Sequence, residues 1–287
     1  MPIVETRERY AQQIKTAANL RSESLVRALA TVPREEFVGA SPWRTVARPA
    51  PGQMQPIVSE VSNPSELYAD VAVFLDQSKT LTNGNPSTLA PWIDGLGLAE
   101  GKSVFHLGCG TGYYTAVMAE VVGPGGSVLA AEIDTALASQ ASASLARYPN
   151  VRVVEGDGGD LEIGARDAIL VNAGVTHPTG RWLDSLNIGG TLILPMTVEL
   201  GMPNVGKGLA LRILKGASAY EASFFPVPVM IYSCSSVRDS SIAAAFGKQM
   251  MAGGTFSAVR SLRRDAHEQG SSCWLHSAEF CLSMQAC

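Results

Sequence analysis

The chain has 287 residues, of which 46% are hydrophobic and 17% charged, and its formal net charge is −4. This length can bury one large α/β core with additions, or two small domains. The mild acidity gives no positive surface for nucleic acid or an anionic membrane, and no apolar run approaches the roughly 18 residues of a membrane span. We therefore expect neither nucleic acid nor a membrane as a partner.

The cysteines are odd in number and scattered: Cys109, Cys234, Cys273, Cys281 and Cys287. No pair of them has the spacing of metal ligands, so we expect no metal site and a reduced, cytoplasmic compartment. The amino terminus is charged and lacks the apolar stretch of a secretory signal, which also favours the cytoplasm.

The first part of the chain is expected to form a helical and loop region over residues 1–80. Residues 5–20 and 22–32 carry apolar positions at the three-to-four spacing of helices. Ser22 or Ser24 can cap the second helix, which Pro33 ends. The proline-rich residues 46–66 show little periodicity and are predicted as loop or weak edge structure.

A core over residues 81–235 follows, in which strand and helix signals alternate. The expected strands are short and rich in Val, Ile and Leu, and they cover residues 103–108, 127–133, 151–157, 167–174 and 189–196. The expected helices cover residues 86–98, 113–122, 135–148 and 181–187. Such runs separated by helices predict a parallel sheet buried on both faces.

The pattern changes beyond residue 200. Residues 208–216, 223–236 and 273–284 are expected as strands, and residues 240–253 as a short helix. Antiparallel strands at one edge of the parallel sheet explain this most simply, with residues 236–287 as an extension packed on the core. The predicted fold class is α/β: a Rossmann-like, doubly wound, mostly parallel sheet with antiparallel edge strands, an N-terminal helical segment and a C-terminal extension.

A glycine-rich turn joins the first core strand to a helix in VFHLGCGTGYYTA, where glycines occupy positions 108, 110 and 112. A nucleoside triphosphate, a dinucleotide and S-adenosylmethionine are the candidate ligands. The triphosphate loop needs Lys-Ser or Lys-Thr after the last glycine, but Tyr113 and Tyr114 follow here. The dinucleotide turn is spaced G-x-G-x-x-G, whereas this one is G-x-G-x-G and suits a ligand without a pyrophosphate.

Polar residues follow the next three strands. Glu132, twenty residues past the last glycine, can accept hydrogen bonds from both ribose hydroxyls of NAD or of S-adenosylmethionine. Asp157 in EGDG can accept from an adenine amino group, and Gly158 lets the backbone approach the ring. Asn172 in NAG ends the fourth strand, where the reactive end of the ligand is expected. Ligands of open parallel sheets bind at these carboxyl ends, so the strand ends together predict an adenosine cofactor.

These motifs resemble those of class I S-adenosylmethionine-dependent methyltransferases. The segments VFHLGCGTGYYTAVMAEVVGPGGSVLAAEID, NVRVVEGDG, DAILVNAG and GGTLILPM, with VPREEFV upstream, are most similar to the protein-L-isoaspartate (D-aspartate) O-methyltransferases. The resemblance covers roughly residues 20–232. It implies that the methionine part of the cofactor lies against Gly108, Gly110 and Gly112, the ribose against Glu132, and the adenine against Asp157 and Gly158.

The chain departs from this family at two positions near the start of the core. The family stretch T-I-S-x-P corresponds to residues 82–86, where Thr82 and Pro86 match but the serine is replaced by Gly84. The acidic residue of the first strand is replaced by His106, which can accept a hydrogen bond from the cofactor's amino group as a neutral ring. Thr82 and one of the two tyrosines, with Tyr113 the first choice, are also expected at the cofactor. These departures leave cofactor binding intact and put isoaspartyl repair in question.

The acceptor decides whether the reaction needs a base. Methyl transfer from a sulfonium is an in-line displacement, in which the enzyme holds the acceptor against the methyl group. A carboxylate is already ionised at neutral pH, whereas a hydroxyl or amine usually benefits from a general base. His177, just past the fourth strand, is a candidate base, or else a loop histidine bonded to backbone or water. Asn83 and Asn85 can orient a carboxylate or amide, or simply form a turn, since Asn-Gly is a common turn pair.

We therefore predict a methyltransferase that uses S-adenosylmethionine, releases S-adenosylhomocysteine and O-methylates a carboxylate of a peptide or small metabolite. One alternative is a hydroxyl- or amine-directed methyltransferase for a natural-product-like molecule, with His177 as base. Another is a non-catalytic module that binds the cofactor, and an NAD-dependent oxidoreductase is disfavoured by the glycine spacing. The sequence leaves the identity of the acceptor and the oligomeric state open.

Overall fold

The computed structural model describes residues 2–49, 55–199, 201, 204–234, 236–253 and 255–287. The chain folds into two compact units. Unit 1 comprises residues 1–102 and 109–156, and unit 2 comprises residues 103–108 and 157–287. The chain therefore passes from one unit to the other three times, and one of these passages lies within the glycine-rich turn.

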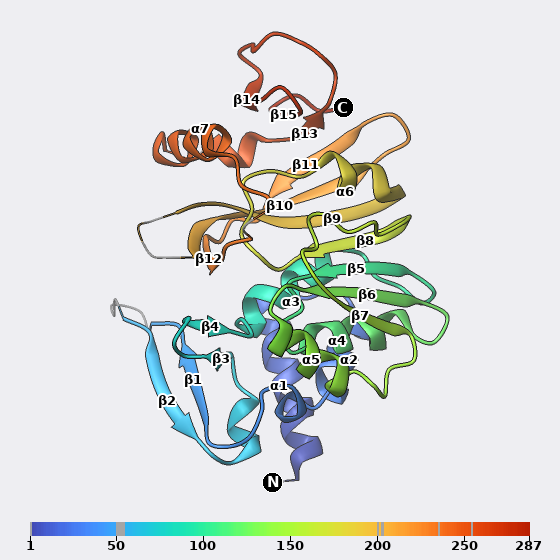
Figure 1. Ribbon diagram of the computed structural model, residues 1–287, viewed down its shortest axis with the longest axis vertical. Helices are drawn as coiled ribbons and strands as arrows, with labels where there is room; N and C mark the ends of the chain where they lie inside the picture. Colours follow the sequence, from blue (N-terminus) through green and yellow to red (C-terminus); the bar gives the residue numbers. More distant parts are fainter. Residues whose placement is uncertain (1, 50–54, 200, 202–203, 235, 254) are drawn as a thin grey trace. The chain divides into compact units, whose positions relative to one another are not determined.

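Unit 1 begins with the two predicted helices, α1 (Ile3–Ala18) and α2 (Glu23–Thr31), which pack against each other (Figure 1). The hydroxyl of Ser22 accepts a hydrogen bond from the backbone N–H of Leu25 and so caps α2, as one of the two predicted caps. The helix ends just before Pro33, and a 3₁₀ turn, η1 (Arg34–Phe37), follows. The predicted helical start of the chain is confirmed.

A small antiparallel sheet follows in unit 1, where we expected loop or weak edge structure. Its order is β2-β1-β3-β4, with the strands β1 (Trp43–Ala47), β2 (Ile57–Val61), β3 (Val71–Asp76) and β4 (Leu81–Thr82). The loop prediction for residues 46–66 is thus wrong at the end of β1 and at β2, although β2 lies at the edge of the sheet, as the expectation of edge structure allowed. Residues 50–54 lie outside the described part. Pro49, Pro56 and Pro64 stand beside the strands rather than within them, so they remove no ladder hydrogen bond. One face of the sheet is buried in a cluster of Val38, Trp43, Leu67 and Val73.

The rest of unit 1 carries strands and helices of the predicted core. They are α3 (Pro86–Gly95), α4 (Tyr113–Val122), β6 (Ser127–Glu132), α5 (Thr135–Ser144) and β7 (Val151–Glu155). Strands β6 and β7 pair in parallel, which places Glu132 opposite Glu155. Pro86 occupies the first turn of α3, as predicted, because its fixed φ suits that position.

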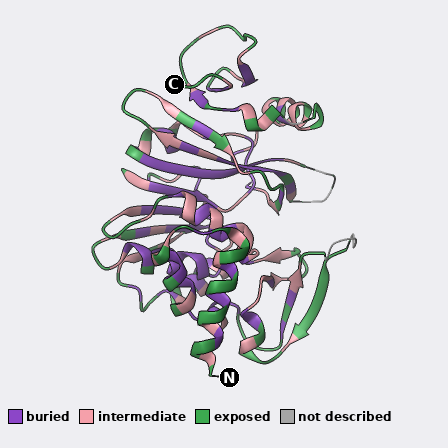
Figure 2. Cartoon of the chain, turned by 180° about the vertical axis from the view of Figure 1, so that it is seen from behind, coloured by how far each residue is buried: buried purple, intermediate pink, exposed green. Residues whose placement is uncertain are grey.

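Unit 2 contains the remaining core strands. They are β5 (Ser103–Leu107), β8 (Arg166–Val171), β9 (Leu186–Glu199), β10 (Val205–Lys215), β11 (Tyr220–Phe224) and β12 (Val229–Tyr232). β5, β8 and β9 pair in parallel, whereas β10 is antiparallel to β9, β11 and β12. Strands β9 and β10 are buried over most of their length (Figure 2). The predicted parallel strands with antiparallel edge strands are therefore confirmed in this unit.

Two boundaries in unit 2 differ from the prediction for local reasons. The helix expected over residues 181–187 is α6 (Gly180–Ser185), and Leu186 already begins β9. The strand expected over residues 223–236 is divided between β11 and β12, because Pro226 and Pro228 between them cannot donate to a ladder.

The C-terminal extension of unit 2 consists of α7 (Ser240–Met251), η3 (Thr255–Ala258), β13 (Ser261–Arg263), β14 (Cys273–His276) and β15 (Cys281–Ser283). β13 pairs with β11 and β15, so the extension continues the antiparallel strands. The rings of Phe224, Phe246 and Trp274 lie 5.2–6.3 Å apart and join the extension to β11. Within the described ranges, none of the helices has the length and apolar character needed to cross a membrane.

Candidate active site

The glycine-rich turn has the predicted strand–turn–helix context. Gly108 follows β5, and Gly112 is the N-cap of α4. Gly108, Gly110 and Gly112 have φ angles of 72°, 56° and 97°, which L side chains rarely adopt. A Cβ on Gly108 would lie 2.9 Å from the carbonyl oxygen of Asn172, and one on Gly112 would lie 2.7 Å from Leu145 Cδ1. The turn therefore requires glycine at these positions.

In unit 1, Glu132 is tied to this turn. Its Oε2 accepts a hydrogen bond of 2.8 Å from the Gly110 amide, and its Oε1 accepts from the amides of Ile133 (3.0 Å) and Asp134 (3.1 Å). The side chain is buried, and the resulting desolvation raises the pKa of Glu132. The hydrogen bonds from the three amides lower this pKa but do not outweigh the desolvation. A carboxylate has about four acceptor positions, so one on Oε2 remains for a hydroxyl.

The turn at residues 82–85 is held by its own side chains. Thr82 Oγ1 accepts from the Gly84 amide at 3.3 Å, and Asn83 Oδ1 accepts from the Val73 amide at 2.8 Å. Gly84 has a φ of 79°, and a Cβ there would lie 2.8 Å from Leu89 Cδ2. The Nδ2 group of Asn83 is buried and finds no hydrogen-bond partner among the described residues. Asn83 and Gly84 therefore form a turn, as one of the two interpretations predicted, and the Asn83 Nδ2 group remains as a buried donor without a partner among the described residues.

Asn85 also has a local role. It is the N-cap of α3, and its Nδ2 donates to the carbonyl of Asp70 at 3.2 Å. Both asparagines thus use one polar group to fix backbone, and their predicted contact with an acceptor stays a prediction.

The two tyrosines at the start of α4 lie in different environments. Tyr113 packs its ring 5.9 Å from that of Phe37 and 4.9 Å from that of Tyr114. The hydroxyl of Tyr114 donates to the carbonyl of Gly84 at 3.2 Å, which links the 82–85 turn to α4. Tyr113 is therefore part of a packed aromatic cluster, and its predicted contact with the cofactor stays a prediction.

Arg34 is a structural residue that the sequence analysis missed. Its side chain is fully buried, with Nη1 donating to the carbonyls of Leu67 and Ala69 and Nη2 donating to that of Val71 at 2.8 Å. Its guanidinium carbon also lies 5.5 Å from the ring centroid of Tyr113. Arg34 therefore joins the first β-sheet to α4, and its place in the motif VPREEFV was the available signal.

In unit 2, His106 is fully buried in β5, in register with Leu170 of β8. Burial lowers the pKa of His106 to about 3, so its imidazole is neutral at physiological pH. A neutral ring has one donor and one acceptor nitrogen, which agrees with the predicted ability to accept a hydrogen bond.

Asn172, Asp157 and Gly158 also lie in unit 2. Asn172 Nδ2 donates to the carbonyl of Gly108 at 3.3 Å, so the end of β8 fixes the first glycine. Asp157 Oδ1 accepts from the Gly159 amide at 2.9 Å and from Ser236 Oγ at 2.7 Å. A Cβ on Gly158 would lie 2.6 Å from Leu107 Cδ1, which explains a glycine at this position.

His177 is held by its neighbours. Its Nδ1 lies 2.8 Å from Thr176 Oγ1, and its ring stacks on Phe280 with the centroids 6.5 Å apart. Burial lowers the pKa of His177, although the charges of Glu279 and Asp239 oppose the shift, so the ring is neutral at pH 7. A neutral histidine with one nitrogen engaged can accept a proton on the other.

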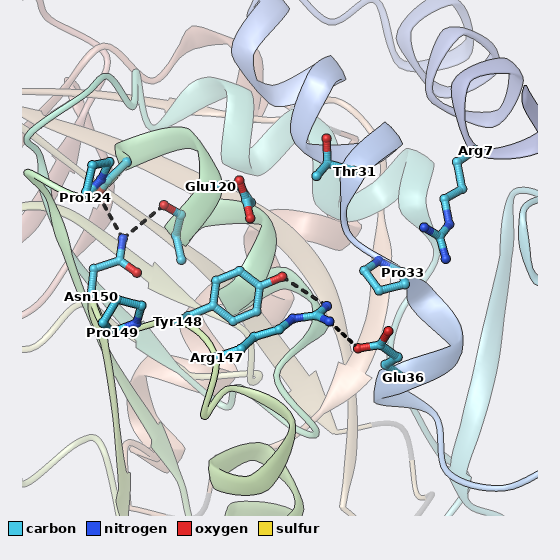
Figure 3. Close-up of a pocket in the computed structure, with 12 residues that line it drawn as sticks. Arg7, Thr31, Pro33, Glu36, Glu120, Pro124, Arg147, Tyr148, Pro149 and Asn150 are labelled. Atoms are coloured by element: carbon cyan, nitrogen blue, oxygen red, sulfur yellow. Dashed lines mark hydrogen bonds and ion pairs between the residues drawn. The ribbon is translucent and has the colours of Figure 1, made fainter. Parts of the chain in front are cut away.

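A cavity of about 510 Å³ lies elsewhere in unit 1 (Figure 3). At this cavity Arg147 pairs with Glu36 at 2.6 Å and with the hydroxyl of Tyr148 at 3.4 Å. Its lining residues are Arg7, Thr31, Pro33, Glu36, Ala119, Glu120, Gly123, Pro124, Arg147, Tyr148, Pro149 and Asn150. They include none of the predicted site residues, so this cavity is distinct from the candidate site.

Comparison with known families assigns the chain. The family described as protein-L-isoaspartate(D-aspartate) O-methyltransferase matches residues 5–203. The chain belongs to this family. The match includes every residue predicted at the cofactor and the acceptor, and it ends before the C-terminal extension. The predicted S-adenosylmethionine cofactor and the predicted class of enzyme, a methyltransferase, are thereby confirmed.

Individual relatives agree. The protein-L-isoaspartate O-methyltransferase of Methanothrix thermoacetophila is 32% identical over 192 residues, which are 66% of this chain and 80% of the relative. That of Thermotoga maritima is 31% identical over 185 residues, but these cover 62% of this chain and only 52% of the relative, about half its length.

Solved structures support the fold. A protein-L-isoaspartate O-methyltransferase superimposes with a TM-score of 0.65 at 24% identity, covering 85% of this chain and 69% of the other. A Plasmodium falciparum protein described as a putative member, in complex with S-adenosyl-L-homocysteine, gives a TM-score of 0.59 at 17% identity and covers 79% and 97%. These neighbours confirm the predicted Rossmann-like α/β class.

Proposed function

We propose that this protein transfers the methyl group of S-adenosylmethionine to a carboxylate of a peptide, with the free α-carboxylate of an isoaspartyl residue as the first choice of acceptor. The observation that carries the proposal is the family match over residues 5–203, since it spans the glycine turn, the acidic strand ends and the 82–86 turn. A carboxylate is ionised at neutral pH, so the enzyme needs to position it and not to deprotonate it.

The chain offers suitable groups for each part of the cofactor. We assign the methionine part to Gly108, Gly110 and Gly112, and the ribose to Glu132, which retains an acceptor position beside its three amide contacts. We assign the adenine to Asp157 and Gly158. The described hydrogen bonds of the Asp157 side chain all use Oδ1, which leaves Oδ2 for the adenine amino group. His106, Asn172, Thr82 and Tyr113 complete the assigned set.

The acceptor is assigned to the 82–85 turn. Asn83 Nδ2 is a buried donor whose hydrogen bond is not made among the described residues, and leaving such a group unpaired costs about 1–3 kcal/mol. An acceptor carboxylate would satisfy it. Gly84 contributes no hydroxyl here, so this donor takes over part of the role that a serine has in the family, together with Asn85.

A second candidate, methylation of a hydroxyl or amine, is favoured by one observation. His177 is neutral and fixed by Thr176, as a general base would be. The two candidates differ in their need for this histidine.

Paired assays of wild type and His177→Ala separate them. One assay uses an isoaspartyl peptide and the other a panel of hydroxylated and amine-bearing small molecules. Carboxylate methylation predicts turnover of the peptide that His177→Ala lowers less than about tenfold, because no proton is abstracted. Turnover of the small molecules alone, lost in His177→Ala by about 10²-fold or more, would overturn the first proposal in favour of the second.

A further inference from the structure

Four potential metal ligands gather in the C-terminal extension of unit 2. They are His267, Cys273, His276 and Cys281, and one donor atom from each lies within 4.8 Å of all the others. Both cysteines are buried, and all four residues lie beyond the part of the chain that the family match covers. The family match therefore does not account for the cluster.

The strands bring these side chains to one face. His276 of β14 stands directly opposite Cys281 of β15 in the antiparallel register. Cys273 lies three positions before His276, an odd spacing that would place the two on opposite faces of a regular strand. A bulge between Cys273 and Leu275 shifts this alternation, so Cys273 also faces the cluster. The strands are closed by a turn in which Ser277 Oγ accepts from the Phe280 amide at 3.1 Å.

The hydrogen bonds around the cluster suit metal ligands. Nδ1 of His267 lies 2.8 Å from the carbonyl oxygen of Asp265, which holds the proton on Nδ1 and leaves the lone pair of Nε2 free. This Nε2 lies 3.6 Å from Cys273 Sγ, which also accepts from the Gly270 amide at 3.4 Å. Nδ1 of His276 is buried and has no hydrogen-bond partner in the part of the chain that the structure describes. A bound cation would satisfy that nitrogen.

We propose that these four side chains bind one Zn²⁺ ion in a tetrahedral, structural site. Two thiolates and two imidazoles form a donor set typical of zinc, and four protein ligands leave no open position for catalysis. With Zn–S near 2.3 Å and Zn–N near 2.0 Å, tetrahedral ligands lie about 3.3–3.8 Å apart. The four donor atoms, which lie within 4.8 Å of one another, must therefore approach by about 1 Å to bind the ion, and small side-chain rotations supply this movement.

The ion would add a cross-link to a segment of short strands, whose apolar side chains Trp274, Leu275 and Leu282 are already buried. β13, β14 and β15 have only 3, 4 and 3 residues, and residues 264–272 connect the first two without a helix or strand. Zinc would join this connection, through His267, to both strands. Cys281 is adjacent to Phe280, whose ring stacks on His177, so the site also fixes the surface against which that histidine rests.

Metal analysis of the purified full-length chain tests this proposal. The protein is produced in zinc-supplemented medium, purified under reducing conditions, and its zinc content is measured by elemental mass spectrometry. We expect one zinc per chain in wild type and in the control Cys287→Ser, which removes a thiol outside the cluster. Cys281→Ser and His276→Ala should lose most of the metal. Zinc-free wild type that binds no added Zn²⁺, or cluster variants that retain full zinc, would overturn the proposal.

A spectroscopic measurement covers the case in which a variant fails to fold. Co²⁺ added to metal-free wild type should give the visible absorption of a tetrahedral site together with thiolate-to-metal charge transfer. His267→Ala, in the connecting residues, should weaken these bands while binding of S-adenosylhomocysteine persists. Octahedral Co²⁺ spectra, or a disulfide between Cys273 and Cys281 in the reduced preparation, would contradict the zinc site and leave the proposed methyl transfer untouched.

Discussion

Replacing Glu132 with glutamine should weaken binding of S-adenosylhomocysteine by about 10- to 150-fold. The carboxylate is buried, and its two oxygens already accept three backbone amides, including that of Gly110 in the glycine turn. In Glu132→Gln, if the amide oxygen keeps the Ile133 and Asp134 donors, the amide NH₂ faces the Gly110 N–H. Two donors then oppose each other.

The magnitude follows from the bonds that are lost. A hydrogen bond to a charged group contributes about 1.5–3 kcal/mol, and each 1.4 kcal/mol is tenfold in affinity. Loss of one charge-assisted bond to the ribose gives the stated range. Loss of the Gly110 bond should further lower the free energy of unfolding by about 1–3 kcal/mol.

Titration calorimetry with S-adenosylhomocysteine measures the affinity, and urea unfolding measures the stability. Glu155→Gln is the matched control, because Glu155 lies opposite Glu132 in the β6–β7 register but is exposed, and its side chain accepts a hydrogen bond from Thr135 Oγ1 at 2.7 Å. We expect this control to bind like wild type. Affinity of Glu132→Gln within twofold of wild type, in a folded protein, would refute the assignment of Glu132 to the ribose.

Three further substitutions test other parts of the account. Arg34→Met should lower the free energy of unfolding by about 3–5 kcal/mol in urea titrations, because the carbonyls of Leu67, Ala69 and Val71 lose a buried cationic donor; a loss below 1 kcal/mol would contradict this. The pKa of His106 is about 3 in the folded protein, against about 6.5 in the unfolded chain. The contribution of the buried neutral ring to folding stability is therefore fully present above pH 6.5 and is lost as the pH falls toward 3. In His106→Leu, the free energy of unfolding should therefore fall less steeply as the pH is lowered from 6.5 toward 3, by up to about 1.4 kcal/mol per pH unit. An unchanged slope would argue against a buried neutral imidazole. Gly84→Ser should cost about 1–3 kcal/mol through its positive φ and the contact with Leu89, and should lower turnover; a stable and more active variant would show that the turn tolerates a side chain.

Local patterns allowed the turns and strand ends that carry the candidate site residues to be predicted from the sequence. The glycine spacing around Gly110 and the acidic strand end at Glu132 are short-range signals, and each reports a backbone geometry that few residue types permit. The helix caps and the buried parallel strands were predicted for the same reason.

The parts that were missed depend on contacts between distant residues. β1 and β2 pair across a proline-rich segment, and their stability comes from a face buried on Leu67 and Val73 that no local window contains. Arg34 is fully buried although arginine is usually exposed, because carbonyls more than thirty residues away accept its donors. The expectation of no metal site considered cysteine spacing alone, whereas the cluster proposed here mixes cysteines with histidines and depends on a strand bulge.

The central claim is methyl transfer to a peptide carboxylate, and a base-lability assay tests it most directly. The enzyme is incubated with methyl-labelled S-adenosylmethionine and an isoaspartyl peptide, and volatile methanol is counted after mild base. The account predicts label in the peptide that base releases as methanol, and none with the matching peptide in which the free α-carboxylate of the isoaspartyl residue is replaced by an amide and the carboxyl terminus is amidated. Folded enzyme that binds S-adenosylhomocysteine but gives no base-labile label with the isoaspartyl peptide would contradict it.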